Sequence, residues 1–72
     1  MRISELVGKG VLDRNANIVG KVADFDIDIP SWTINRLVVK SGLIKKSAIG
    51  VDKIDKIGDK VILKVTREEL EK

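Results

Sequence analysis

Short hydrophobic runs rich in Val and Ile alternate with glycine-containing segments along the whole chain. The six glycines lie at positions 8, 10, 20, 42, 50 and 58. β-branched residues favour strands, and glycine marks the turns and bulges between them. Regularly spaced short strands are typical of small β-barrels and β-sandwiches. The pattern therefore predicts an all-β domain.

Six strands are predicted, at residues 10–13, 18–28, 34–41, 47–51, 54–57 and 61–65. A single helical turn, Ser4-Glu5-Leu6, is expected before them. The Gly58-Asp59 pair predicts a two-residue hairpin turn. Residues 14–17 predict a turn in which an Asn adopts the left-handed conformation. Thr66 and Glu69 form a capping-box pattern, so a short C-terminal helix should follow.

The longest predicted strand, IVGKVADFDID, changes the phase of its hydrophobic pattern. Ile18 and Val22 are apolar at even positions, whereas Phe25 and Ile27 are apolar at odd positions. Side chains alternate between the faces of a strand, so a regular strand cannot place both sets on one face. A β-bulge or sharp bend near Val22 and Ala23 would reconcile them. We then expect Phe25 and Ile27 to fill a closed interior.

Three aspartates, Asp24, Asp26 and Asp28, alternate with these apolar residues. Their spacing matches the opening of an EF-hand loop, but that loop needs glycine at its sixth position and glutamate at its twelfth. Ile29 and Asn35 hold those positions, so the calcium-loop hypothesis fails. The alternation favours a solvated strand face; a recognition surface for a basic partner and a metal or catalytic site are the alternatives. Asp24 is predicted to accept backbone N–H bonds and hold the bend.

Pro30 ends the long strand, because proline cannot donate to a sheet ladder. Two hairpin registers with the next strand are then open. A two-residue loop gives the pairs Ile27–Ile34 and Phe25–Arg36. A longer loop gives the pairs Phe25–Leu37, Ala23–Val39 and Asp26–Arg36. We favour the longer loop, because it pairs apolar residues inside and opposite charges outside.

The composition is that of one globular domain. The chain has 72 residues, 43% hydrophobic and 35% charged, with a formal net charge of +3. We assign residues 1–72 to a single domain, with a core at about 3–65 and a short C-terminal helix or tail at 66–72. The chain has no Cys and no His, which excludes disulfides, Cys/His zinc sites and Ser-His or Cys-His nucleophiles. No catalytic residue, metal or cofactor is predicted, and the protein is expected not to be an enzyme.

No hydrophobic run approaches the roughly 20 residues that span a bilayer, and the N-terminal residues MRISEL do not resemble a signal peptide. We therefore expect a cytoplasmic protein with no direct membrane insertion.

Five apolar residues are predicted to contact a partner: Trp32, Ile34, Val38, Leu43 and Ile44. Trp32 lies in the hairpin loop, where it either seals the open end of the barrel, anchors an interface or stacks on a nucleobase. Ile34 and Val38 are expected on the face opposite the core, and Leu43-Ile44 interrupts a basic loop. These exposed residues need cover from a homodimer, a partner protein or the terminal helices.

Seven lysines crowd the C-terminal half: Lys40, Lys45, Lys46, Lys53, Lys56, Lys60 and Lys64. A solvated face is the favoured interpretation, and contact with an acidic protein patch or with phosphate groups are the alternatives. A groove for RNA would need aromatic residues among the lysines. Because the only aromatic residues are Phe25 and Trp32, nucleic acid is the less favoured partner.

The order of several short motifs resembles that of PRC-barrel domains. The motifs are Gly8-Lys9-Gly10-Val11 with Asp13, Ile18-Val19-Gly20-Lys21-Val22 with Asp24, Asp28, Leu37-Val38-Val39, and Ile54-x-x-Ile57-Gly58-Asp59-x-Val61-Ile62-Leu63. The resemblance covers about residues 3–65 and depends on order and spacing, because each motif alone is only a turn or strand signature. Gly50 departs from it, since family members commonly carry an Ile-Pro pair where this chain has Ile49-Gly50.

The resemblance implies a small six-stranded, strongly bent PRC-type β-barrel with short terminal helical turns. Similar domains form the cytoplasmic domain of the photosynthetic reaction-centre H subunit and the C-terminal domain of the bacterial ribosome maturation factor. Stand-alone archaeal members of this length resemble adaptors of cell division, which engage the protein that tethers the tubulin-like division ring to the membrane. These roles share protein–protein binding without chemistry.

We therefore predict a non-catalytic adaptor and, from the resemblance, a component of an archaeal cell-division scaffold. Its expected partner is a protein such as the membrane tether of the division ring, and a homodimer is a further possibility. The alternative function, from a different class, is an RNA-processing or ribosome-assembly factor whose lysines lie near phosphate groups.

Overall fold

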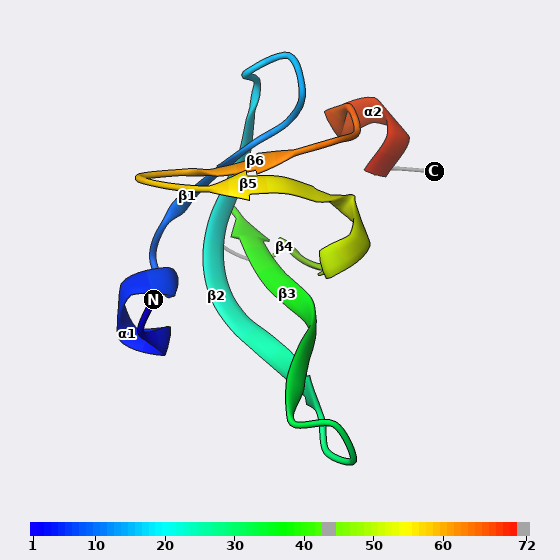
Figure 1. Ribbon diagram of the computed structural model, residues 1–72. Coiled ribbons are helices and arrows are strands. Elements are labelled where there is room, and N and C mark those ends of the chain that lie inside the picture. The colour runs from blue at the N-terminus through cyan, green and yellow to red at the C-terminus, as the bar shows by residue number, and fades with distance from the viewer. Residues whose placement is uncertain (43–44, 71–72) are drawn as a thin grey trace.

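A computed structural model describes residues 1–42 and 45–70 of the chain. Its elements are α1 (Ile3–Leu6), β1 (Gly10–Leu12), β2 (Ile18–Asp28), β3 (Thr33–Ser41), β4 (Lys45–Gly50), η1 (Val51–Lys53), β5 (Ile54–Ile57), β6 (Val61–Leu63) and α2 (Arg67–Leu70). The strands form one sheet in the order β4-β3-β2-β1-β6-β5 (Figure 1). Neighbours are antiparallel except β1 and β6, which are parallel. The predicted six-stranded β fold with short helical turns near both ends is confirmed.

The sheet is strongly bent but not closed, so the prediction of a closed barrel is wrong for the described residues. The edge strands β4 and β5 do not pair with each other. The 3₁₀ turn η1 separates them along the chain, and the Lys64 N–H donates to the Lys53 carbonyl oxygen at 2.8 Å. This bond directs β5 toward β6, so one edge of β4 and one edge of β5 stay open.

The bend in β2 lies where the change of hydrophobic phase predicts it. Val22 is opposite Val39 and Asp24 is opposite Val38, so Ala23 is an extra residue without a partner in β3. The predicted β-bulge is confirmed, but the predicted Ala23–Val39 pair is wrong. Figure 1 shows β2 as a long arc that passes from the body of the sheet into a projecting hairpin.

The hairpin between β2 and β3 combines both predicted registers. The Phe25–Leu37 and Asp26–Arg36 pairs of the favoured register are confirmed. A second register shift then leaves Asn35 without a partner and places Ile27 opposite Ile34. This pair belongs to the register that we did not favour.

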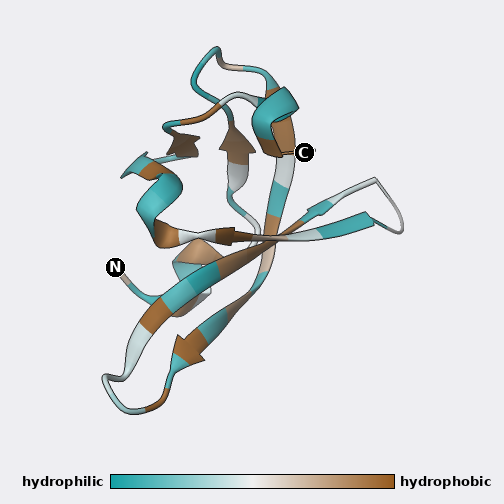
Figure 2. Cartoon of the chain, turned by 90° about the vertical axis from the view of Figure 1, so that its right-hand side faces the viewer, coloured by the Kyte–Doolittle hydropathy of each residue, from teal (hydrophilic) through white to brown (hydrophobic). Residues whose placement is uncertain are grey.

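Eight buried hydrophobic residues from six elements form the core: Leu6, Val11, Val22, Leu37, Val39, Ile49, Val61 and Leu63. Figure 2 shows hydrophobic stretches of the strands meeting where the strands cross. Phe25 is half-buried and packs against this core, as predicted. Ile27 is 41% exposed, so the prediction that it fills the interior is wrong. Its pair with Ile34 is next to the Asp28–Thr33 pair at the end of the β2–β3 ladder.

Two turns differ from their predictions. The left-handed conformation in residues 14–17 belongs to Ala16, with φ 65°, and not to an Asn. The β5–β6 hairpin has a three-residue loop, because Ile57 pairs with Val61. Gly50 has φ −63°, which is the angle that proline requires. Gly50 therefore has a backbone φ that is compatible with the proline of the family pattern.

The short C-terminal helix begins as its capping pattern predicts. The Glu69 N–H donates to Thr66 Oγ1 at 3.2 Å, and the Thr66 hydroxyl lies 3.1 Å from Glu69 Oε1. Among residues 1–42 and 45–70, no helix has the length and hydrophobicity needed to cross a membrane.

Candidate functional site

The projecting turn between β2 and β3 presents Trp32 to solvent. The Asp28–Thr33 pair closes the turn. Ser31 Oγ donates to Asp28 Oδ2 at 2.6 Å and lies 2.7 Å from Thr33 Oγ1. Trp32 has φ 55° and is 76% exposed. It does not seal the end of the sheet, so of the three alternatives for Trp32 only those that leave the ring exposed agree with the structure.

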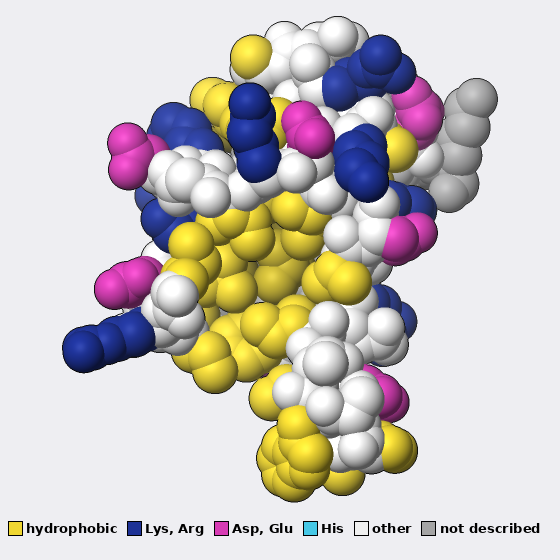
Figure 3. Space-filling model, in the orientation of Figure 1, with side chains coloured by type: hydrophobic (Ala, Val, Ile, Leu, Met, Phe, Trp, Pro, Cys, Tyr) yellow, Lys and Arg dark blue, Asp and Glu magenta, His cyan; other side chains and the backbone are white. Residues whose placement is uncertain are grey.

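The residues beside Trp32 extend this turn into an apolar tip. We define the apolar tip as Ile27, Ile29, Pro30 and Trp32; Ile29 is 60% exposed, and Pro30 is also exposed. Figure 3 shows hydrophobic side chains at the end of the hairpin and in a hollow between the hairpin and the strands above it. The hydrogen bonds of Ser31 hold the turn that carries Trp32. A side chain on such a turn loses little conformational freedom on binding, which favours Trp32 as an anchor of an interface.

Ile34 and Val38, the other predicted contact residues that the structure describes, are half-buried, and Ile34 lies opposite Ile27 of the apolar tip. Ile34 is half-buried and packs against the core, so its predicted outward orientation is wrong. The unpaired Asn35 shifts the alternation of β3 by one residue and turns Ile34 inward. Val38 is half-buried between buried neighbours, opposite Asp24 and Ala48. Leu43 and Ile44 lie outside the described residues, and their contact role stays a prediction.

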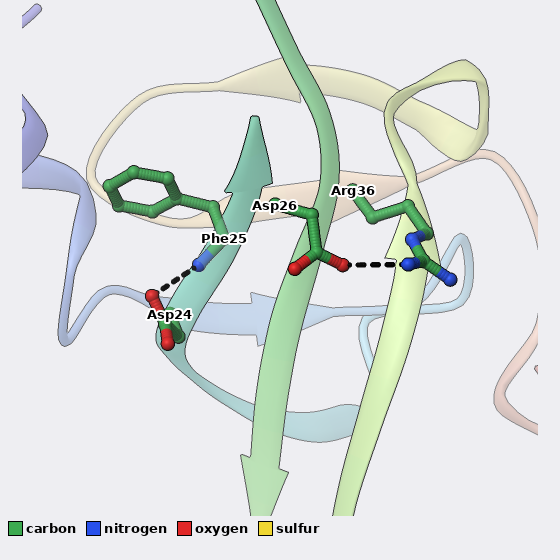
Figure 4. A network of polar contacts seen from close by, with 4 residues as sticks. All are labelled: Asp24, Phe25, Asp26 and Arg36. Atoms are coloured by element: carbon green, nitrogen blue, oxygen red, sulfur yellow. Dashed lines mark hydrogen bonds and ion pairs between the residues drawn. The ribbon is translucent and has the colours of Figure 1, made fainter. Parts of the chain in front are cut away.

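Each aspartate of the ladder serves local structure. The Phe25 N–H donates to Asp24 Oδ1 at 2.8 Å, which confirms the predicted backbone bond at the bend. Asp26 Oδ2 lies 2.9 Å from the Arg36 guanidinium across the strand pair (Figure 4). Asp28 accepts the Ser31 hydroxyl. Within the described part of the chain, no three acidic side chains are grouped as a metal site requires.

Asp13 is a buried carboxylate for which the sequence pattern alone predicts no separate role. It is 1% exposed and accepts four hydrogen bonds: from the N–H groups of Asn15, Asn17 and Arg67, each at 2.8 Å, and from Asn17 Nδ2 at 3.2 Å. Burial acts to raise the pKa of Asp13, but these four bonds outweigh burial and lower its pKa. The carboxylate joins the end of β1 to the start of α2, so its role is structural.

A groove of about 780 Å³ runs along β1 and β2 toward the end of β3. Its cationic side chains are Lys21, Lys40, Lys60 and Arg67, and its apolar lining includes Ile18, Val19 and Ala23. Four glycines, at positions 8, 10, 20 and 42, also line it. The groove lies at the end of the β2–β3 ladder opposite the apolar tip, since Lys21 pairs with Lys40 and Asp28 pairs with Thr33.

These features define a small β-sheet domain with an exposed apolar tip and a basic groove. The comparison with protein families agrees: residues 1–70 match the PRC-barrel domain. The chain belongs to this family, which confirms that part of the resemblance and indicates a small protein-interaction module. A search of curated proteins found no match for the chain.

Proposed function

We propose that this protein is a non-catalytic adaptor that binds another protein through the apolar tip. The observation that carries the proposal is the exposure of Trp32 on a turn held by Ser31, Asp28 and Thr33. Tryptophan is enriched among the residues that dominate binding energy, and a soluble monomer gains nothing from leaving a large indole in water.

The finer proposal is a role in an archaeal cell-division scaffold, with the membrane tether of the division ring as the partner. It is supported by membership of the PRC-barrel family and by the resemblance, stated above, to archaeal members with that role. Self-association through the apolar tip is a second way to cover the same residues.

The test measures binding of purified division-ring tether to the immobilised protein by biolayer interferometry. Wild type should bind, and Trp32→Ala should weaken the affinity at least about thirtyfold, the loss expected for a hot-spot residue worth 2 kcal/mol or more. Ile57→Ala is the matched control, because Ile57 is an exposed hydrophobic residue on β5, away from the tip. Unchanged affinity for Trp32→Ala would remove the apolar tip from the interface.

A second candidate function is RNA binding in ribosome assembly, which the four cations of the groove favour. A gel shift with bulk RNA at several salt concentrations tests it. Micromolar or tighter binding at physiological salt, falling steeply as salt rises, would support this function over the adaptor.

A further inference from the structure

Lysine side chains form a row across β2, β3 and β4, and a fourth lysine, from the β5–β6 loop, extends the row over β1. Lys21 in β2 is opposite Lys40 in β3, and Lys40 is opposite Lys46 in β4. Residues opposite each other in a ladder project from the same face, about 5 Å apart. These three lysines therefore lie side by side on one face.

The row continues over β1 through Lys60, which lies in the β5–β6 loop. Gly10 in β1 is the partner of Lys21 on its other side, so a Cβ on Gly10 would point to the same face as Lys21. Lys60 Nζ lies 3.3 Å from that Cβ position. Lys60 thus covers Gly10 and supplies the charge that the glycine lacks. We call Lys60, Lys21, Lys40 and Lys46 the lysine row.

Like charges directly opposite each other destabilise a sheet. Within residues 1–42 and 45–70, the ion pair that forms is the one between Arg36 and Asp26, and it leaves the lysine row unneutralised. The nearest acidic residue along β2 is Asp24, which accepts the Phe25 N–H and is opposite Val38. An anion from outside would relieve this repulsion.

The groove supplies both charge and apolar surface beside this row. Three members of the row, Lys21, Lys40 and Lys60, line it together with Arg67, and its described lining contains no Asp or Glu. Ile18, which is largely exposed, and Val19 give it apolar surface. Neither Phe25 nor Trp32 lines it, so it lacks the stacking surface that proteins use for single-stranded nucleic acid.

We propose that the lysine row and the groove bind an extended acidic segment of another protein, in which carboxylates alternate with apolar side chains. Along an extended segment, every second side chain lies on the same face at about 6.8 Å spacing. Carboxylates on that face can pair with the row, because the long, flexible lysine side chains reach across the difference between this spacing and the roughly 5 Å between strands. This second site is independent of the apolar tip, because it lies at the other end of the β2–β3 ladder.

The test uses a fluorescein-labelled ten-residue peptide of alternating Glu and Val, with a Gln-Val peptide and ten-nucleotide oligouridine as comparison probes. Fluorescence anisotropy measures their affinities at 50 mM and 300 mM NaCl. The Glu-Val peptide should bind more tightly than both other probes and should weaken at the higher salt. The double substitution Lys21→Gln with Lys40→Gln should weaken its binding roughly five- to thirtyfold.

The matched control is Lys53→Gln with Lys64→Gln. It removes the same charge from two exposed lysines outside the groove lining and should change the affinity less than about twofold. If both double variants lost the same affinity for the Glu-Val peptide, binding would depend on the overall positive charge and not on the lysine row, and the proposed site would be wrong. Tighter binding of oligouridine, lost on removing Lys21 and Lys40, would assign the row to nucleic acid and overturn the peptide proposal. Neither result bears on Trp32, so the adaptor proposal is tested separately.

Discussion

Gly20 lies where β2 approaches β3 closely, and replacing it with alanine tests the bend of the sheet. Its φ is 159°, in the region that favours glycine. A Cβ at this position would overlap the carbonyl oxygen of Lys40 and would approach Val39 Cγ1 to 2.9 Å. The Lys40 carbonyl belongs to the backbone, so it cannot move aside as the end of a side chain can.

The expected cost has two parts. The unfavourable backbone conformation costs about 1–3 kcal/mol, and forcing an extra methyl group into a packed site costs about 1–3 kcal/mol more. Gly20→Ala should therefore destabilise the fold by about 2–6 kcal/mol. A 72-residue domain has a free energy of unfolding of about 4–11 kcal/mol, so the loss is a large fraction of the total.

Thermal unfolding followed by circular dichroism measures this loss. Since 1 kcal/mol corresponds to about 4–8 °C in a domain of this size, Tm should fall by at least about 8 °C. Gly58→Ala is the matched control, because Gly58 has no positive φ and a Cβ there has no neighbour within 4 Å. It should leave Tm unchanged or raise it slightly. Equal Tm values for the two variants would refute the close approach at Gly20.

Two further predictions concern the core and Asp13. Leu37→Ala should lower the free energy of unfolding, measured in urea, by about 2–5 kcal/mol, because Leu37 is fully buried. Ile27→Ala should lower it by less than about 1.5 kcal/mol, because the Ile27 side chain is partly in water. Equal losses would show that Ile27 belongs to the core. The pKa of Asp13 is lower in the folded chain than in the unfolded chain. The ionised carboxylate therefore stabilises the fold at any pH above the ordinary carboxyl pKa of 3.8. This stabilisation is lost as the pH falls from 3.8 through the lowered pKa of the folded chain. Asp13→Asn should therefore lower Tm at pH 7 and flatten the fall in Tm between pH 5 and about pH 2; an unchanged acid profile would contradict the role given to its four hydrogen bonds.

The hydrophobic pattern predicts local features of this fold well and long-range ones poorly. The phase change in β2 predicts a bulge because two apolar sets cannot share one face, and the structure has it at Ala23. Nothing comparable marks Asn35, so the second bulge and the inward turn of Ile34 were missed. Closure of the sheet depends on whether β4 and β5 meet, which is a contact between edges and has no signature in either strand.

The candidate sites show the same limit. A tryptophan in a hairpin loop was identifiable from its neighbours in the sequence, but its exposure depends on the hydrogen bonds of Ser31. The role of Asp13 and the lysine row were missed, because each is completed by residues from distant segments, although Asn15 and Asn17 supply three of the four hydrogen bonds of Asp13. Arg67 lies 54 residues from Asp13, and Lys21 and Lys40 become neighbours only through the strand register. Asn15 and Asn17, which follow Asp13, could have indicated its role, because Asp and Asn residues favour turns in which a side chain accepts backbone N–H bonds.

The most direct test of the adaptor account uses Trp32 itself, because it is the one tryptophan of the chain. Fluorotryptophan labelling gives a single ¹⁹F resonance, and its shift between H₂O and D₂O reports solvent exposure of the indole. The account predicts an exposed indole in the free protein that loses this solvent shift when purified division-ring tether is added. A tether that binds while the indole keeps its solvent shift, or an indole already protected in the free protein, would contradict it.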